Sequence, residues 1–268
     1  DVYWAGKYNS INCAAGHHVY EGRWLRNGDT YLKDYIQFWM KGSGNVRSYS
    51  TWIVDAIYQF CLTKGDFRMA VDLLPHMTEN YEQWEKEHMH ESGLFWSIDD
   101  RDAMEYSISG NGLRPTLNSY LYADAVAISR IADIAGDHQC AEKYRQKAEK
   151  IKRLVQEKLW DQAAEFFKVI PLEKKEAPVE QWDFLQIEAK HNVREEIGFI
   201  PWCFHLPDAG YEKAWKQITD KEGFAAPYGP TTAEQRHPRY NYEQPDHECL
   251  WNGPSWPFAT TQTLTAMA

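Results

Sequence analysis

Gly-Asp pairs recur along the chain at a regular interval. Each pair is typical of a position where one helix ends and the next begins. In Gly28-Asp29, Gly65-Asp66 and Gly136-Asp137, a glycine suited to ending one helix precedes an aspartate suited to capping the next. A fourth aspartate, Asp208, follows Pro207. The four aspartates are 37, 71 and 71 residues apart, which is one or two multiples of about 36. Two helices with their connections fill that length, so the pattern predicts a stack of helical hairpins.

Apolar residues between these pairs recur every three or four positions, as on one face of an α-helix. In the clearest case, the stripe consists of Val71, Leu74, Met77, Tyr81 and Trp84. The predicted helices are 30–41, 49–63, 66–89, 115–135, 138–159, 181–197, 209–219 and 256–268. A short strand or hairpin is predicted at 160–172, and with little other strand the predicted fold class is all-α.

Charge and composition exclude several classes of partner. The chain has a net charge of −10 and no basic stripe, so no nucleic-acid partner is predicted. No apolar run has membrane-spanning length, so no membrane is predicted. The histidine-rich stretches lack a recognised zinc spacing and there is no phosphate-binding glycine loop, so neither metal nor cofactor is predicted. The five cysteines are scattered, which predicts buried thiols and leaves the compartment and the oligomeric state open.

Three long connections, 42–48, 90–114 and 221–255, are rich in Gly, Asn, Arg and aromatic residues. Long ordered loops in a compact domain are usually functional. The chain is 15% aromatic, with 12 Trp and 16 Tyr, and many of these rings lie in polar segments. Such a surface suits a sugar, because its CH faces stack on rings and its hydroxyls need fixed polar partners. The expected partner is therefore an oligosaccharide or glycoside in a cleft lined by these loops.

The segment DDRDAMEYSISG concentrates carboxylates in one of these loops. Asp99 and Asp100 are predicted to be solvated or paired with Arg101, as surface acids usually are. Asp102 and Glu105 differ, because the apolar side chains beside them can partly desolvate them. Desolvation raises the pKa of a carboxyl group towards that of a general acid.

The segment 224–257 is too rich in proline for a long helix. Trp251 and Trp256 are candidate platforms for a sugar ring, with the alternative that at least one of them fills the interior. Arg47 is a candidate for holding a carboxylate through a bidentate pair. The predicted substrate-binding residues are Arg47, Arg101, Tyr106, Arg114, Tyr228, Glu243, Glu248, Trp251, Asn252 and Trp256.

Several motifs together resemble a known family. They are GRWLRNGDTYLKDYIQFWMKGSGNVRSYSTWIVDA, RDAMEYSISGNGLRPTLNSYLYADAVAISRIA, EEIGFIPWCFHLP, GFAAPYGPTTAEQRHPRY and CLWNGPSWPFATTQTL. The chain resembles the mannosylglycerate-hydrolase-like glycoside hydrolase domain, which is related to glycoside hydrolase family 63 and the trehalases (six-hairpin glycosidases). The resemblance implies an (α/α)6 barrel, an inverting mechanism and an active site on the face with the long loops.

The resemblance also implies roles for single residues. The general acid of these families lies in a Gly-aromatic-Asp-x-Ser motif, matched here by residues 103–107, so Glu105 takes the acid position and Asp102 is the fallback. The Trp-Arg-Gly-Pro-x-Trp motif that lines the sugar site appears as Trp251 to Trp256. Asn252 replaces its arginine, which puts a charged substrate contact there in doubt.

The general base is not identified by the resemblance, because the relatives carry it well after the Trp motif and this sequence ends at Ala268. Three alternatives follow: the base lies in sequence beyond Ala268, which we favour; it is Glu243, Asp246 or Glu248; or the domain does not hydrolyse anything. The expected domain is a single (α/α)6 barrel over residues 1–268, truncated at its C-terminal end, with its N-terminal end in question.

The leading hypothesis is inverting hydrolysis of an α-linked glucoside or mannoside by a carboxylic acid and a carboxylate. The competing hypotheses are a carbohydrate-binding or scaffold domain that has lost its general base, and a helical-repeat interaction module.

Overall fold

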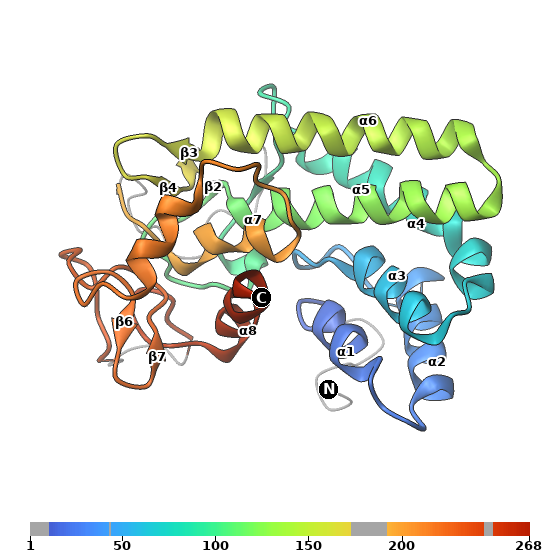
Figure 1. Cartoon of the computed structure of the whole chain (residues 1–268), viewed down its shortest axis with the longest axis horizontal. Coiled ribbons are helices and arrows are strands. Elements are labelled where there is room, and N and C mark those ends of the chain that lie inside the picture. Colours follow the sequence, from blue (N-terminus) through green and yellow to red (C-terminus); the bar gives the residue numbers. More distant parts are fainter. Residues whose placement is uncertain (1–10, 43, 173–191, 244–248) are drawn as a thin grey trace. The chain divides into compact units, whose positions relative to one another are not determined.

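The structure is a computed structural model that describes residues 11–42, 44–172, 192–243 and 249–268 (Figure 1). Its α-helices are α1 (Ala15–Gly22), α2 (Asp29–Met40), α3 (Ile53–Lys64), α4 (Arg68–His88), α5 (Pro115–Ala135), α6 (His138–Leu154), α7 (Ile200–Cys203) and α8 (Pro257–Met267). Its strands, of two residues each, are β1 (Trp96–Ser97), β2 (Gly112–Leu113), β3 (Trp160–Asp161), β4 (Phe166–Phe167), β5 (Ile170–Pro171), β6 (Ala225–Ala226) and β7 (Gly229–Pro230). The predicted all-α fold class is confirmed.

Most predicted helices are present. Helix α5 has the predicted bounds, α4 lies inside the predicted 66–89, and α6 continues through a π-helical turn to Leu159. The prediction for 209–219 is wrong in type, since Glu212–Ile218 forms a 3-10 helix. Of the predicted helix 181–197, residues 181–191 lie outside the described residues. The end of the predicted helix overlaps a 3-10 helix, Glu196–Phe199. The predicted hairpin is confirmed as β3 and β4.

Two of the Gly-Asp pairs mark helix boundaries as predicted. Gly65 ends α3 in the left-handed conformation, with φ +67°, which glycine adopts without steric cost. Asp66 then accepts the N–H of Arg68 at 3.1 Å, in the first turn of α4. Asp137 likewise accepts the N–H of Cys140 at 3.0 Å, in the first turn of α6.

The other two positions do not act as predicted. Gly28 has a φ of −89° and ends no helix, because α1 already ends at Gly22. Asp208 caps no backbone amide that the structure describes; its carboxylate pairs instead with the Lys152 ammonium at 2.6 Å. The prediction of buried thiols also holds only for Cys61, since the other four cysteines are partly exposed.

The chain divides into two compact units, the first formed by residues 1–89 and 120–150 and the second by 90–119 and 151–268. In the first unit, α5 and α6 form an antiparallel hairpin (Figure 1), in which the Ser129 hydroxyl donates to the Ala141 carbonyl at 2.8 Å. A buried carboxylate on α5 anchors α3: Oδ1 of Asp124 accepts the N–H groups of Val54 and Asp55 at 3.1 and 2.9 Å. This unit thus consists of helical hairpins, as the sequence predicts.

The second unit holds the strands and two of the three long connections, 90–114 and 221–255, whereas 42–48 belongs to the first unit. Strands β1, β2 and β5 form an antiparallel sheet in which Leu113 lies opposite both Trp96 and Ile170. A separate aromatic core is built from Phe166, Phe199 and Phe224, against which half-buried rings pack. Within the described residues, no helix is both long and apolar enough to cross a membrane.

Candidate active site

Arg114 is the centre of a buried network in the second unit. Its side chain is fully buried, and its Nε donates to Asp102 Oδ2 at 2.5 Å. Its Nη1 donates to Ser107 Oγ at 3.1 Å and to the Gly110 carbonyl at 2.5 Å. Asp102 also accepts the hydroxyl of Thr116 and is itself fully buried. Asp102 and Arg114 were predicted to face the substrate, but the structure uses them to hold the 99–114 loop from inside.

Asp99 belongs to the same network, so the prediction of a solvated or Arg101-paired Asp99 is wrong. The residue is 4% exposed and accepts the N–H of Asp100 at 2.8 Å and the hydroxyl of Ser107 at 3.3 Å. Burial raises the pKa of Asp99 to about 6, although the Arg114 guanidinium opposes the shift. Asp100 does pair with Arg101, at 3.3 Å, as predicted.

Glu195 completes the network and was missed by the sequence analysis. Its carboxylate accepts the N–H of Ser109 at 3.2 Å and also the Ser109 hydroxyl. Burial raises the pKa of Glu195, against the attraction of Arg114. Its signal in the sequence is that two adjacent acids, Glu195 and Glu196, precede the apolar run IGFIPW in a motif that also carries the family resemblance. Acids adjoining a buried run are expected to be buried with partners.

Glu105 lies on a strained turn held by this network. Ala103 and Tyr106, on either side of it, have φ values of 58° and 62°, in the left-handed region that non-glycine residues rarely adopt. Each such residue costs about 1–3 kcal/mol and persists only where the surroundings impose it. Glu105 and Tyr106 are both half-buried. The strained turn therefore carries a half-buried glutamate next to the charged network of Arg114.

The Glu105 turn is joined to the Trp motif by a backbone hydrogen bond. The N–H of Trp251 donates to the Glu105 carbonyl at 3.0 Å. The Trp251 and Trp256 rings stack, with centroids 5.2 Å apart and planes 6° apart. Trp251 is 4% exposed, which favours the alternative that it fills the interior, whereas Trp256 is half-buried and covers it. Two segments predicted from separate motifs thus lie together in one place.

Asn252 follows Trp251 and fixes a further segment. Its carbonyl accepts the N–H of Asn241 at 3.0 Å, while its side-chain Oδ1 is buried and has no hydrogen-bond partner within the described part of the chain. The next residue, Gly253, donates its N–H to Thr232 Oγ1 at 3.0 Å. A buried oxygen without a partner carries an energetic cost, which a ligand donor can relieve.

The remaining predicted residues lie elsewhere. Tyr228 is 99% exposed, and Glu243 is exposed on the segment that contains Asn241. Glu248 and Asp246 lie outside the described residues. Arg47 is in the first unit, where its Nη1 donates to Asn80 Oδ1 at 3.3 Å and its Nε lies 3.5 Å from Glu87 Oε2, which is not the bidentate pair expected.

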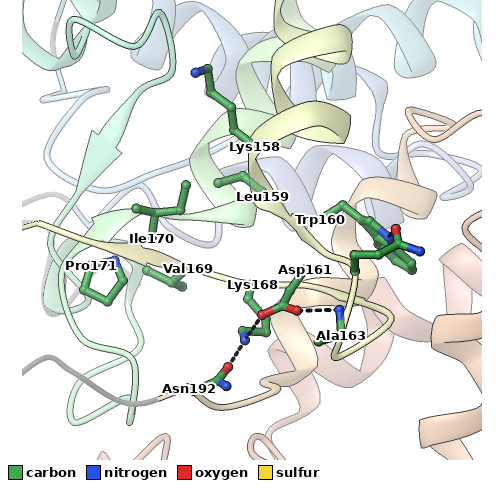
Figure 2. Close-up of a pocket in the computed structure, with 11 residues that line it drawn as sticks. Lys158, Leu159, Trp160, Asp161, Ala163, Lys168, Val169, Ile170, Pro171 and Asn192 are labelled. Atoms are coloured by element: carbon green, nitrogen blue, oxygen red, sulfur yellow. Dashed lines mark hydrogen bonds and ion pairs between the residues drawn. The ribbon is translucent and has the colours of Figure 1, made fainter.

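A pocket of about 610 Å³ beside the β3–β4 hairpin contains none of the predicted residues (Figure 2). Lys168 lies in its wall between Asp161 Oδ2, at 2.5 Å, and Asn192 Oδ1, as Figure 2 shows. The hydrogen bond from Lys168 lowers the pKa of Asp161. Among the described residues, no group of three or more His, Cys, Asp or Glu is placed to hold a metal ion.

Comparison with known sequences identifies the family. A sequence model of the mannosylglycerate hydrolase MGH1-like glycoside hydrolase domain matches residues 7–268. The chain belongs to this family. A search of curated proteins gives no significant match.

Solved structures share the fold of this chain. A structure named as a sialidase is 40% identical, with a TM-score of 0.87 over 99% of this chain and 24% of the other. The family 63 mannosylglycerate hydrolase of Thermus thermophilus, in complex with glucose, is 12% identical, with a TM-score of 0.64 over 82% of this chain and 62% of the other. An uncharacterised conserved protein of the same organism is 13% identical, with a TM-score of 0.59 over 82% of this chain and 63% of the other. The chain thus spans about a quarter of the first of these proteins and less than two thirds of the other two.

Proposed function

We propose that this glycoside hydrolase-type domain hydrolyses an α-linked glucoside or mannoside with inversion, and that Glu105 is its general acid. The observation that carries the proposal is the backbone hydrogen bond from Trp251 to Glu105. It joins the turn that presents the carboxyl group to the aromatic motif suited to a sugar ring. The strained φ values on both sides of Glu105 support a functional role for the turn.

In this reaction the Glu105 carboxyl group donates its proton to the glycosidic oxygen as the C–O bond breaks. A second carboxylate takes a proton from water, whose oxygen forms the new bond to the anomeric carbon from the opposite face. The products are a free sugar of inverted configuration and the protonated leaving group. The two carboxyl groups must be about 6.5–9.5 Å apart to leave room for the water.

The identity of the general base is part of the proposal. Asp99, Asp102, Glu195 and Glu196 are all buried and hydrogen-bonded, so they have no surface on which to hold a water molecule. Glu243 is exposed and remains a candidate, together with Asp246 and Glu248. A carboxylate outside residues 1–268 is a further candidate, because this chain covers only 24% and 62% of two of the structures that it matches.

Asp102 has a different role in this proposal. Its ion pair with Arg114 fixes the start of the Glu105 turn, since the two charges can remain buried only together. It is therefore a positioning residue, and Arg114 is its partner. The half-buried Trp256 is left to bind the sugar ring.

The test compares Glu105→Gln with Asp102→Asn in the full-length protein, assayed with α-linked gluco- and manno-disaccharides. We expect Glu105→Gln to lower kcat by about 10²–10⁴-fold, because the proton donor is lost, and to leave the melting temperature nearly unchanged. Asp102→Asn leaves Arg114 without its counter-charge and should lower the melting temperature by several degrees. Retention of full turnover by Glu105→Gln would refute its assignment as the acid.

A further inference from the structure

Two adjacent glutamates in the second unit are both almost completely buried. Glu195 is 4% exposed and Glu196 is 1% exposed. Glu195 has an extended backbone, with φ −123° and ψ 150°. Glu196 begins the 3-10 helix that follows. The two buried carboxyl groups contact different parts of the unit, Ser109 and Thr263.

Glu195 points to the loop that carries Glu105. Its oxygens accept both the N–H and the hydroxyl of Ser109, 86 residues earlier in the chain. Ser109 lies between Ser107 and Gly110, which are both held by Arg114. The carboxylate of Glu195 thus ties the end of the loop to a segment far away in sequence. Hydrogen bonds to a charged acceptor are stronger than those between neutral groups, so this tie resists local opening.

Glu196 points to α8. Its Oε1 accepts the hydroxyl of Thr263 at 3.2 Å, while Oε2 is buried and has no hydrogen-bond partner among the residues that the structure describes. Burial raises the pKa of Glu196 well above its ordinary value, and the hydroxyls of Thr263 and Thr260 only partly oppose this. Burial therefore favours the neutral form of this carboxyl group. Helix α8 begins at Pro257, directly after Trp256.

The backbone of the same segment reaches the Trp motif by another route. The N–H of Glu196 donates to the Thr232 carbonyl at 2.9 Å. Thr232 in turn exchanges hydrogen bonds with Gly253, through its N–H at 3.4 Å and its hydroxyl at 3.0 Å. Residues 231–234 therefore lie between the glutamate pair and the Trp motif, and all of these contacts are within one unit.

We propose that Glu195 and Glu196 are paired positioning residues that hold the two halves of the sugar site in register. Glu195 fixes the loop that presents Glu105, and Glu196 fixes the helix that follows Trp256. The interpretation of these two halves as one sugar site rests on the proposed function. The anchoring contacts made by Glu195 and Glu196 do not depend on it. Neither glutamate touches substrate in this scheme.

Hydrogen–deuterium exchange of the full-length protein tests the two anchoring contacts, Glu195 to Ser109 and Glu196 to Thr263, without a substrate. Glu195→Ala should lower amide protection about tenfold in residues 99–111 and leave α8 unchanged. Glu196→Ala should lower the amide protection of α8 and leave residues 99–111 unchanged. Ser109→Ala and Thr263→Val remove the partners instead of the buried acids and should give the same two patterns more mildly. Equal effects of all variants on both segments, or no effect on either, would overturn the proposal.

Rescue and kinetics separate positioning from a general loss of stability. Glu196→Gln keeps a neutral acceptor for Thr263 and should restore protection of α8. In the active full-length protein, Glu195→Ala should mainly lower kcat, because it disturbs the acid, and Glu196→Ala should mainly raise KM, because it disturbs the sugar-holding side. The same kinetic change in both variants would overturn the division of roles. If the wild-type protein shows no turnover, the proposed function fails. The exchange pattern still shows whether Glu195 anchors residues 99–111 and Glu196 anchors α8.

Discussion

One guanidinium faces three carboxyl groups beneath the Glu105 turn. Arg114 is paired directly with Asp102, and its charge also acts on Asp99 and Glu195. A single buried cation cannot keep three buried acids ionised without a large desolvation cost. Asp99, with a pKa of about 6, takes up a proton within an accessible pH range. The interior below the turn therefore changes its charge between weakly acidic and neutral pH.

The raised pKa of Asp99 predicts a specific pH dependence of stability. Asp99 ordinarily ionises at 3.8, so between about pH 4 and 6 the folded chain keeps a proton that the unfolded chain has released. Its contribution to the free energy of unfolding is full below pH 3.8 and is lost as pH rises through 6. The side chain of the Asp99→Asn variant cannot titrate. The free energy of unfolding of this variant, relative to wild type, should therefore increase by about 1–3 kcal/mol from pH 4 to pH 7.

Urea unfolding of both proteins at several pH values measures this difference. Taking the difference matters, because exposed acids with lowered pKa values, such as Asp161 and Asp208, contribute a trend of opposite sign in both proteins. A difference that stays flat from pH 4 to pH 7 would show that Asp99 does not titrate in that range.

At the scale of elements, the Trp motif is positioned by close backbone contact. A Cβ atom at Gly253 would lie 2.7 Å from the carbonyl carbon of Asn241 and nearer still to its oxygen. The segment that contains Asn241 packs here because residue 253 has no side chain. Gly136 provides a contrast, since a Cβ there meets nothing within 4 Å and only its φ of +80° opposes substitution.

Gly253→Ala should therefore push the two segments apart. We expect it to lower the free energy of unfolding by about 1–3 kcal/mol and to change the near-UV circular dichroism of the stacked Trp251–Trp256 pair. The control Gly136→Ala should cost about 1 kcal/mol and leave that signal unchanged. An unaltered near-UV spectrum in Gly253→Ala would contradict the packing described here.

The helices were predictable and the contacts between loops were not. Periodicity is local, so α4 and α5 follow from stripes of apolar residues in their own sequence. Asp208 shows the limit of this reasoning, because its capping role was inferred from neighbours whereas its real partner, Lys152, is 56 residues away in the chain. Whether a polar residue caps a helix or pairs elsewhere depends on tertiary contacts.

At the scale of the whole molecule, the same contrast applies to the site. Glu105 and the Trp motif were found by resemblance, and the structure brings them together. The buried Asp99 and Glu195 were misjudged or missed, because nothing within a few residues of either shows its partner. Acids are solvated in most proteins, and only the fold reveals which ones are buried with a counter-charge.

The stereochemistry of the product tests the proposed reaction for the complete protein. Inversion requires water to attack opposite the leaving group, so an α-linked disaccharide should release the β-anomer first. Proton NMR of the anomeric signals in the first minutes, before mutarotation equilibrates them, measures this directly. Glu105→Gln should release neither anomer at a comparable rate, which excludes a contaminating glycosidase. Initial release of the α-anomer would instead indicate a retaining mechanism, with carboxyl groups about 5–5.5 Å apart and Glu105 in a different geometry.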